Sequence, residues 1–161
     1  MYRVIRFFES HPEKIPDYPL VIFDEYQDFN FLETKLARLL YSKSPVLIVG
    51  DDDQALYGFK QASPDYIRQL AQNQDFQRFE LPYCSRCTEV IVEAMTKVIS
   101  KAKVIGRLKN RIDKPFKYFP PDKHADSQAN PTIINVNCSV ERKNCRYIGK
   151  YIAKEISGIP T

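Results

Sequence analysis

Two short apolar segments that each end in carboxylates constrain the fold of this chain most strongly. They are Leu20-Val-Ile-Phe-Asp24-Glu25 and Val46-Leu-Ile-Val-Gly50-Asp51. Apolar runs this short, bounded by proline or charge, predict strands that are buried on both faces of a parallel sheet. The intervening segment 31–41 has leucines at helical spacing and is followed by Pro45. This order predicts a right-handed crossover, so both acidic ends should lie at one edge of the sheet, where α/β proteins bind ligands.

The composition is that of a folded globular protein, and the length suits one domain or parts of two. The chain has 161 residues, of which 43% are hydrophobic and 27% are charged. Its apolar runs are too short to cross a bilayer, and the N-terminal segment lacks the pattern of a secretory signal. We therefore expect a cytoplasmic protein whose four cysteines are reduced.

The rest of the chain indicates further helices and strands on either side of a boundary near residue 75. Helices are predicted over 2–9, 64–73, 86–102 (with Ser85 as the N-cap) and 140–157, and strands over 76–81 and 132–138. Segment 103–131 is basic and poorly periodic, and it is predicted to be a long connection. The predicted domains are residues 1–75 and 76–161.

Charge is distributed unevenly between the two halves. Residues 1–80 hold 9 Lys/Arg and 13 Asp/Glu, a net of −4, whereas residues 81–161 hold 15 and 7, a net of +8. This asymmetry is compatible with a metal–nucleotide site beside a surface that binds a polyanion. The lysines and arginines between residues 97 and 117 could follow a phosphate backbone, and a solvated helix face is an equal alternative.

The first segment continues as Asp24-Glu-Tyr-Gln-Asp28. An apolar strand that ends in Asp-Glu is the Walker B arrangement of nucleotide hydrolases. Asp24 would hold Mg²⁺, because this ion prefers hard oxygen ligands, and Glu25 could polarise the water that attacks the γ-phosphate. The alternative is a strand that simply ends at a polar surface.

The second segment continues through three aspartates to Gln54-Ala-Leu-Tyr57-Gly-Phe59-Lys60. Adjacent carboxylates repel one another unless they face solvent, a cation or hydrogen-bond donors. Gln54 could reach a phosphate oxygen or the attacking water, Lys60 could pair with a phosphate, and Tyr57 and Phe59 could stack on bases. We expect Gly50 to permit an unusual backbone turn. The alternative is a solvated acidic loop followed by two core aromatics.

Taken together, the strings DEYQD and GDDDQALYGF closely resemble motifs II and III of the UvrD/Rep/PcrA-like superfamily 1 DNA helicases. A third string, Leu81-Pro-Tyr-Cys-Ser-Arg86-Cys-Thr-Glu-Val-Ile91, resembles motif IV of that family. The resemblance covers about residues 18–100. It implies a partial RecA-like parallel sheet with flanking helices, followed by the start of a second RecA-like domain.

The resemblance also implies cofactors, partners and residue roles. The cofactors are ATP and Mg²⁺, and the partners are single-stranded or partially duplex DNA and the remainder of a helicase chain. Asp24 would coordinate Mg²⁺, Glu25 would be the catalytic base, Gln54 would sense the γ-phosphate, and Arg86 would reach the nucleotide from the second domain. The implied positions for contact with single-stranded DNA are Tyr57, Phe59 and Lys60.

Several positions depart from the family pattern. Ser85 stands where an aromatic residue usually stacks on adenine, so either Tyr83 makes that contact or the stacking is weaker. Lys60 replaces a common arginine and loses its planar fork, and Gln61 replaces a usual glycine.

The string G-x-x-x-x-G-K-[ST], which forms the phosphate cradle of these enzymes, does not occur in the sequence. We therefore expect an internal fragment of an ATP-dependent helicase that does not hydrolyse ATP by itself. One alternative is a stand-alone inactive RecA-like module that binds DNA or a partner protein. Another is a subunit of a helicase–nuclease complex.

The four cysteines have two interpretations. Cys84 and Cys87 have the spacing of half a zinc site, which Cys138 and Cys145 could complete. Reduced structural cysteines are the favoured interpretation, because metal sites usually show two tight pairs.

Overall fold

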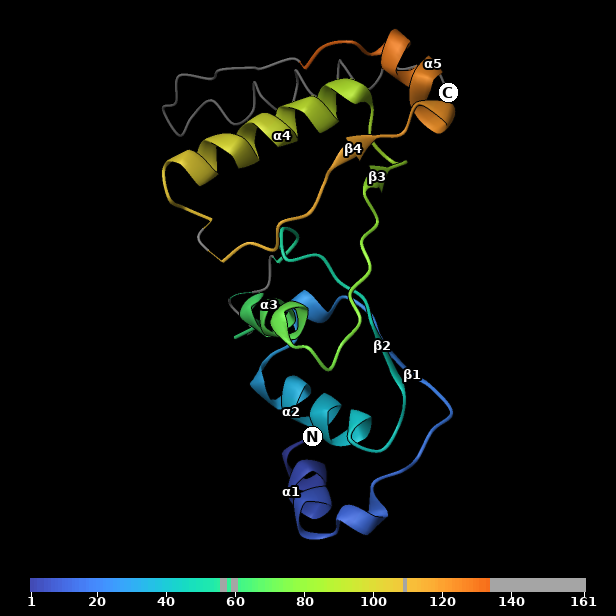
Figure 1. Cartoon of the computed structure of the whole chain (residues 1–161), viewed down its shortest axis with the longest axis vertical. Coiled ribbons are helices and arrows are strands. Elements are labelled where there is room, and N and C mark those ends of the chain that lie inside the picture. The colour runs from blue at the N-terminus through green and yellow to red at the C-terminus, as the bar shows by residue number, and fades with distance from the viewer. Residues whose placement is uncertain (56–57, 59–60, 109, 134–161) are drawn as a thin grey trace, which may run out of the picture.

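The computed structural model describes residues 1–55, 58, 61–108 and 110–133 (Figure 1). These residues form a mixed α/β structure of short strands and helices. In chain order the elements are α1 (Tyr2–Ser10), the 3-10 helix η1 (Pro12–Lys14), β1 (Val21–Phe23), the 3-10 helix η2 (Tyr26–Asp28), α2 (Phe31–Tyr41), β2 (Val46–Ile48), α3 (Asp65–Gln72), β3 (Tyr83–Cys84), α4 (Glu89–Val104), β4 (Lys117–Tyr118) and α5 (Pro120–Ala129).

The predicted strand–helix–strand unit is confirmed. Strands β1 and β2 pair in parallel, with Val21 opposite Val46 and Phe23 opposite Ile48. Helix α2 connects them and begins with a capping box at Asn30 and Glu33. The Asn30 side chain accepts hydrogen bonds from the first helical turn, and the Glu33 carboxylate accepts one from the Asn30 amide at 2.8 Å. This reciprocal pairing satisfies backbone donors that a helix N-terminus otherwise leaves unpaired, so the helix starts at a defined residue.

The core of this half lies on one side of the β1–β2 sheet. Tyr26, Ala37 and Ile67 form its buried centre, from η2, α2 and α3 respectively. The prediction that both faces of the strands are buried is wrong: Ile22 is 60% exposed and its partner Leu47 is 48% exposed. Successive residues of a strand point to opposite faces, and the described helices pack on only one of them.

The second half, at the other end of the molecule in Figure 1, is built around helix α4 and a parallel pair of two-residue strands, β3 and β4. The predicted strand over 76–81 is wrong. Phe79 and Leu81 are 78% and 91% exposed, and this segment pairs with no neighbouring strand in the described part of the chain. An alternating pattern without a partner ladder does not hold a strand, since pairing supplies its hydrogen bonds.

Helix α4 begins at Glu89 with Thr88 at the N-cap, so Ser85 is not its cap. The connection predicted over 103–131 contains β4 and α5. The predicted helix 140–157 lies outside the described residues, as does most of the predicted strand 132–138. The division into two domains stays a prediction.

Candidate functional site

The two acidic turns lie at the carboxyl ends of the paired strands β1 and β2, as the sequence predicts. Beyond the register of β1 and β2, the Val49 amide donates to the Phe23 carbonyl at 2.8 Å, and the Tyr26 amide donates to the Val49 carbonyl at 3.0 Å. The backbone ladder therefore continues past the ends of the strands. It fixes the turn at Asp24–Glu25 beside the turn at Asp51–Gln54.

The first turn, Asp24–Glu25, is exposed. Glu25 has a left-handed backbone with φ 51° and ψ 41°, and its amide donates to Asp24 Oδ1 at 2.8 Å. A glutamate in this region is unusual, and such conformations concentrate at functional sites. No lysine or arginine pairs with either carboxylate within the described residues. The turn thus presents two uncompensated oxygen-rich side chains.

Gln27 joins the two turns, a role that the sequence analysis missed. Its side chain is buried with 1% exposure. The amide nitrogen donates to Glu25 Oε2 at 2.6 Å, and the amide oxygen accepts from the Asp51 amide at 3.0 Å. The side chain therefore links the Glu25 carboxylate directly to the start of the second turn. The only sequence feature that could have indicated this role is the position of Gln27 within the string DEYQD.

Gly50 is required by space and not by an unusual backbone angle. A Cβ at this position would lie 2.6 Å from Gln27 Oε1 and 2.7 Å from Ile67 Cδ1. The backbone of Gly50 does not have a positive φ, so the unusual turn that we expected does not explain why this residue is glycine. The missing side chain lets the Gln27 amide lie directly against the backbone.

The second turn carries Asp51, Asp52 and Asp53, and it is neutralised by cations from elsewhere in the chain. The Lys114 ammonium contacts a carboxylate oxygen of all three aspartates. Arg111 binds Asp53 with a two-pronged contact, at 2.8 Å from Nε to Oδ1 and 2.7 Å from Nη2 to Oδ2. The requirement that these carboxylates face cations or donors is therefore met by side chains of the protein.

Asp52 is the buried member of this group, with a side chain that is 0% exposed. It accepts hydrogen bonds from Arg68 Nε at 2.9 Å, from the Ile112 amide at 3.0 Å and from Lys114. Burial by itself would raise the pKa of Asp52, but the Lys114, Arg68 and Ile112 donors outweigh it and hold that pKa below its ordinary value. Burial by itself would lower the pKa of Lys114, but its contacts with the Asp51 and Asp52 carboxylates raise that pKa above its ordinary value.

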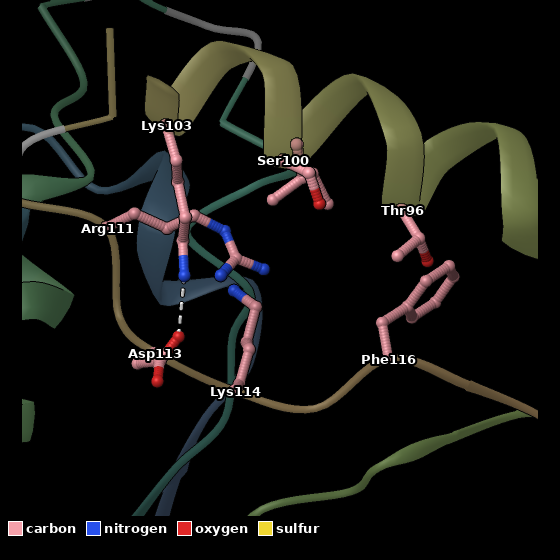
Figure 2. A pocket seen from close by; sticks show the side chains of 8 residues that line it. Thr96, Ser100, Lys103, Arg111, Asp113, Lys114 and Phe116 are labelled. Atoms are coloured by element: carbon pink, nitrogen blue, oxygen red, sulfur yellow. Dashed lines mark hydrogen bonds and ion pairs between the residues drawn. The ribbon is translucent and has the colours of Figure 1, made fainter. Parts of the chain in front are cut away.

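We call Arg111 and Lys114, with the backbone between them, the basic clamp. It comes from the chain that follows α4 and returns alongside the second turn (Figure 1). Figure 2 shows both side chains in a surface pocket beside α4, where Lys103 pairs with Asp113 at 2.8 Å. The clamp connects the acidic half of the chain to the basic half.

The other predicted site residues that the structure describes, Gln54, Arg86 and Tyr83, are all exposed. Gln54 is exposed, and its side-chain nitrogen donates to Asp51 Oδ2 at 2.8 Å, so the clamp holds it indirectly. Arg86 is exposed in the bend between β3 and α4. Tyr83 is 56% exposed, and its ring centroid lies 5.7 Å from that of Phe119. The proposed DNA-contacting side chains of Tyr57, Phe59 and Lys60 lie outside the described residues.

The donor sets of the two turns differ in their fit to a metal ion. Asp51, Asp52 and Asp53 lie close enough to one another to share an ion, but the Lys114 ammonium already contacts all three. Asp24 and Glu25 offer exposed carboxylate oxygens without a paired cation in the described part of the chain, which suits a hydrated Mg²⁺. The chemistry of the first turn therefore fits the ion that the resemblance implies.

Comparison with known proteins finds a helicase domain in the first half of the chain. Residues 6–76, which carry both acidic turns, match the UvrD/REP helicase N-terminal domain. This match supports the family resemblance over the first half of the chain.

The curated relatives are DNA helicases by name. DNA helicase II of Rickettsia typhi is 31% identical over 141 residues, 85% of this chain and 19% of the relative. DNA helicase II of Haemophilus influenzae is 30% identical over 105 residues, 62% of this chain and 14% of the relative. The putative ATP-dependent DNA helicase YjcD of Bacillus subtilis is 28% identical over 133 residues, 74% of this chain and 17% of the relative. The chain thus spans less than a fifth of the length of these relatives.

No helix among the described residues combines the length and the apolar character that a bilayer crossing requires.

Proposed function

We propose that this chain supplies the metal-binding and water-activating side chains, and part of the DNA-binding track, of an ATP-dependent DNA helicase. The helicase moves along single-stranded DNA and unwinds duplex by hydrolysing ATP. Support comes from the match to a helicase domain and from relatives named as helicases. The chain lacks the phosphate-cradle string, so another part of the same helicase provides that cradle.

One observation carries the proposal. The parallel pairing of β1 and β2 sets the Asp24 and Glu25 carboxylates, which pair with no cation among the described residues, beside the turn that ends in Gln54. Gln27 connects the two by hydrogen bonds at both ends of its amide. A change at one turn, such as loss of a bound phosphate, is thereby transmitted to the other.

In this proposal Asp24 holds Mg²⁺, and the ion, when bound, neutralises charge on the nucleotide phosphates. Glu25 takes a proton from the attacking water, and the Gln27 amide orients its carboxylate. Gln54 and Arg86 contact the γ-phosphate, and Tyr83 lies near the base. The proposed DNA contacts are Tyr57, Phe59 and Lys60.

The basic clamp acts through the second turn. Lys114 and Gln54 both bind the Asp51 carboxylate, so the clamp fixes the turn from which Gln54 projects. Arg111 and Lys114 are therefore positioning residues for Gln54. They connect its orientation to the chain that follows α4, in the half that also carries Arg86.

The first experiment establishes the protein that carries this chain. An immunoblot of the source cell, with antibody raised against residues 1–161, should show a band several times larger than 18.8 kDa. A band at 18.8 kDa would favour a stand-alone binding module and would contradict the proposed helicase.

The second experiment measures phosphate release by that complete polypeptide with and without single-stranded DNA. Glu25→Gln should reduce the DNA-stimulated rate by about 100-fold or more, because it removes the general base. Glu13→Gln, at an exposed position of η1, is the matched control and should retain the rate. Equal rates for wild type and Glu25→Gln would disprove the assigned role. The isolated chain should show no hydrolysis above background.

A further inference from the structure

The pair Cys84 and Cys87 stands outside the nucleotide and DNA chemistry proposed above. Cys84 is the last residue of β3, and Cys87 directly precedes Thr88, the N-cap of the 16-residue helix α4. Both thiols are free and partly exposed. A Cys-x-x-C pair between a strand and a helix N-terminus is a setting in which thiolates become reactive.

The surroundings of Cys84 favour its thiolate. The groups that act on its sulfur are the backbone amides of Cys87 and Arg86 and the Cys87 thiol. Partial burial alone would raise the pKa of Cys84, but these donors and the charge of Arg86 outweigh it and lower that pKa. Burial and the neighbouring Cys84 sulfur raise the pKa of Cys87. The two thiols are therefore unequal, as in a nucleophile with its resolving partner.

The charged groups facing the pair come from its own bend and from α5. Arg86 lies between the two cysteines, and the field of Lys123 of α5 acts on Cys87. The start of α4 is joined to α5, because the Glu89 amide donates to Ser127 Oγ at 3.0 Å. Among the described residues, the potential metal ligands that gather in threes are confined to Asp51–Asp53, so no third ligand there completes a zinc site at the cysteines.

We infer that Cys84 and Cys87 form a reversible redox pair in which a hydroperoxide oxidises Cys84 and Cys87 resolves it to a disulfide. With hydrogen peroxide, the Cys84 thiolate attacks one oxygen, an S–O bond forms, the O–O bond breaks, and the leaving hydroxide takes a proton to become water. The Cys87 thiol then attacks the sulfenic sulfur, an S–S bond forms, and the oxygen leaves as a second water. The two thiols lose two electrons, which reduce the peroxide.

The disulfide would have a consequence at Arg86. It closes a ring over Ser85 and Arg86 and restricts the backbone from which the Arg86 side chain projects. This step rests on the proposed function, in which Arg86 contacts the γ-phosphate. Oxidation would then lower hydrolysis by the complete helicase, and a dithiol reductant would restore it.

The test of the redox pair uses the full chain with Cys138→Ser and Cys145→Ser, so that only the pair remains. After treatment with dilute hydrogen peroxide the mass should fall by about 2 Da, the loss of two hydrogen atoms. Trypsin cuts after Arg86, so the disulfide should link peptides 79–86 and 87–97, and dithiothreitol should release them. An unchanged mass, or linkage only between separate chains, would overturn the inference.

Two further measurements separate the roles of the thiols. In the unmodified chain, competitive alkylation at neutral pH should label Cys84 faster than Cys87, a comparison that needs no variant. In Cys87→Ser the oxidised Cys84 should accumulate as a sulfenic acid that dimedone traps, whereas Cys84→Ser should give no such adduct at Cys87. Equal labelling of the two thiols would contradict the assignment of Cys84 as nucleophile.

The same oxidation is then applied to the complete helicase. Loss of DNA-stimulated phosphate release with formation of the 84–87 disulfide supports both the pair and the role of Arg86. If the disulfide forms and the rate is unchanged, the redox pair stands and the proposed role of Arg86 fails. If no disulfide forms, the redox pair fails and the proposed helicase function is unaffected.

Discussion

The two acidic turns of this protein lie at the same edge of the same sheet, yet they have opposite electrostatic surroundings. The Asp24–Glu25 turn is exposed and has no paired cation within the described residues. The Asp51–Asp53 turn is bound by Lys114, Arg111 and Arg68. A carboxylate that is already paired gains little from a metal ion, whereas an unpaired one retains its full attraction for a cation.

The difference indicates that the first turn is suited to binding a ligand, whereas the second turn stabilises the structure. The first turn carries strain, with Glu25 in the left-handed region, and offers exposed carboxylates that no lysine or arginine of the described residues pairs with. The second turn holds the two halves of the chain together, because its partners Arg111 and Lys114 come from beyond α4. Sites that bind ligands often retain strain and uncompensated charge, and the surrounding structure stabilises them.

The largest expected effect comes from breaking the basic clamp. Lys114→Met leaves three carboxylates together, one of them fully buried, and should reduce the free energy of unfolding by about 3 kcal/mol. The measurement is urea unfolding followed by circular dichroism. Lys103→Met removes a lysine of the same pocket whose partner Asp113 is exposed, and it should change the midpoint very little. Equal losses of unfolding free energy in the two variants would show that the contacts of Lys114 with the aspartates contribute no more than an exposed ion pair.

A smaller effect is expected where the two turns meet. Gly50→Ala places a Cβ against Gln27 Oε1 and the Ile67 side chain, and it should destabilise the fold by about 1–3 kcal/mol. Gly58→Ala is the matched control, since its Cβ would meet no atom of the described residues within 4 Å, and its effect should stay within about 0.5 kcal/mol. Unfolding midpoints for both variants test the comparison. A neutral Gly50→Ala would contradict the tight approach of Gln27 to the backbone.

The pH dependence of stability should reveal the ion pairs of the second turn. The pKa of Asp52 is lowered in the folded state, so its ionised form stabilises the fold above its ordinary pKa. That contribution is lost as the pH falls through the folded-state pKa, in the range below about 4. The stability difference between wild type and Asp52→Asn should therefore be large at pH 7 and should shrink as the solution is acidified. A difference that stays constant down to strongly acid pH would exclude an ionic contribution.

The smallest expected effect on stability is at the first turn. Asp24→Asn keeps the oxygen that accepts from the Glu25 amide and removes a charge that has no cationic partner in the described structure. The unfolding free energy should change by less than about 0.5 kcal/mol. In the proposed helicase, in which Asp24 would hold Mg²⁺, the same variant should require more Mg²⁺ for ATP hydrolysis, which a metal titration of the rate measures. A strongly destabilised Asp24→Asn would erase the distinction between the turns.

Local sequence pattern was sufficient for much of the first half. The apolar runs at Val21–Phe23 and Val46–Ile48, with leucines at helical spacing between them, predict the parallel pair and its crossover helix. The alternation over 76–81 failed, because a strand also needs a neighbour. Exposure of Ile22 and Leu47 was likewise unpredictable, since an apolar strand does not specify how many of its faces will be covered.

The sequence by itself determined that two acidic turns lie at one sheet edge, because strand order and crossover fix that edge. It also indicated that three adjacent aspartates need cations or donors. Only the tertiary structure decided which cations these are, since Arg111 and Lys114 lie about sixty residues away along the chain. The tertiary structure also shows that Gln27 joins the two turns and that the missing side chain of Gly50 leaves space for the Gln27 amide. Ion pairs and close contacts depend on distances in space, and separation along the chain does not determine these distances.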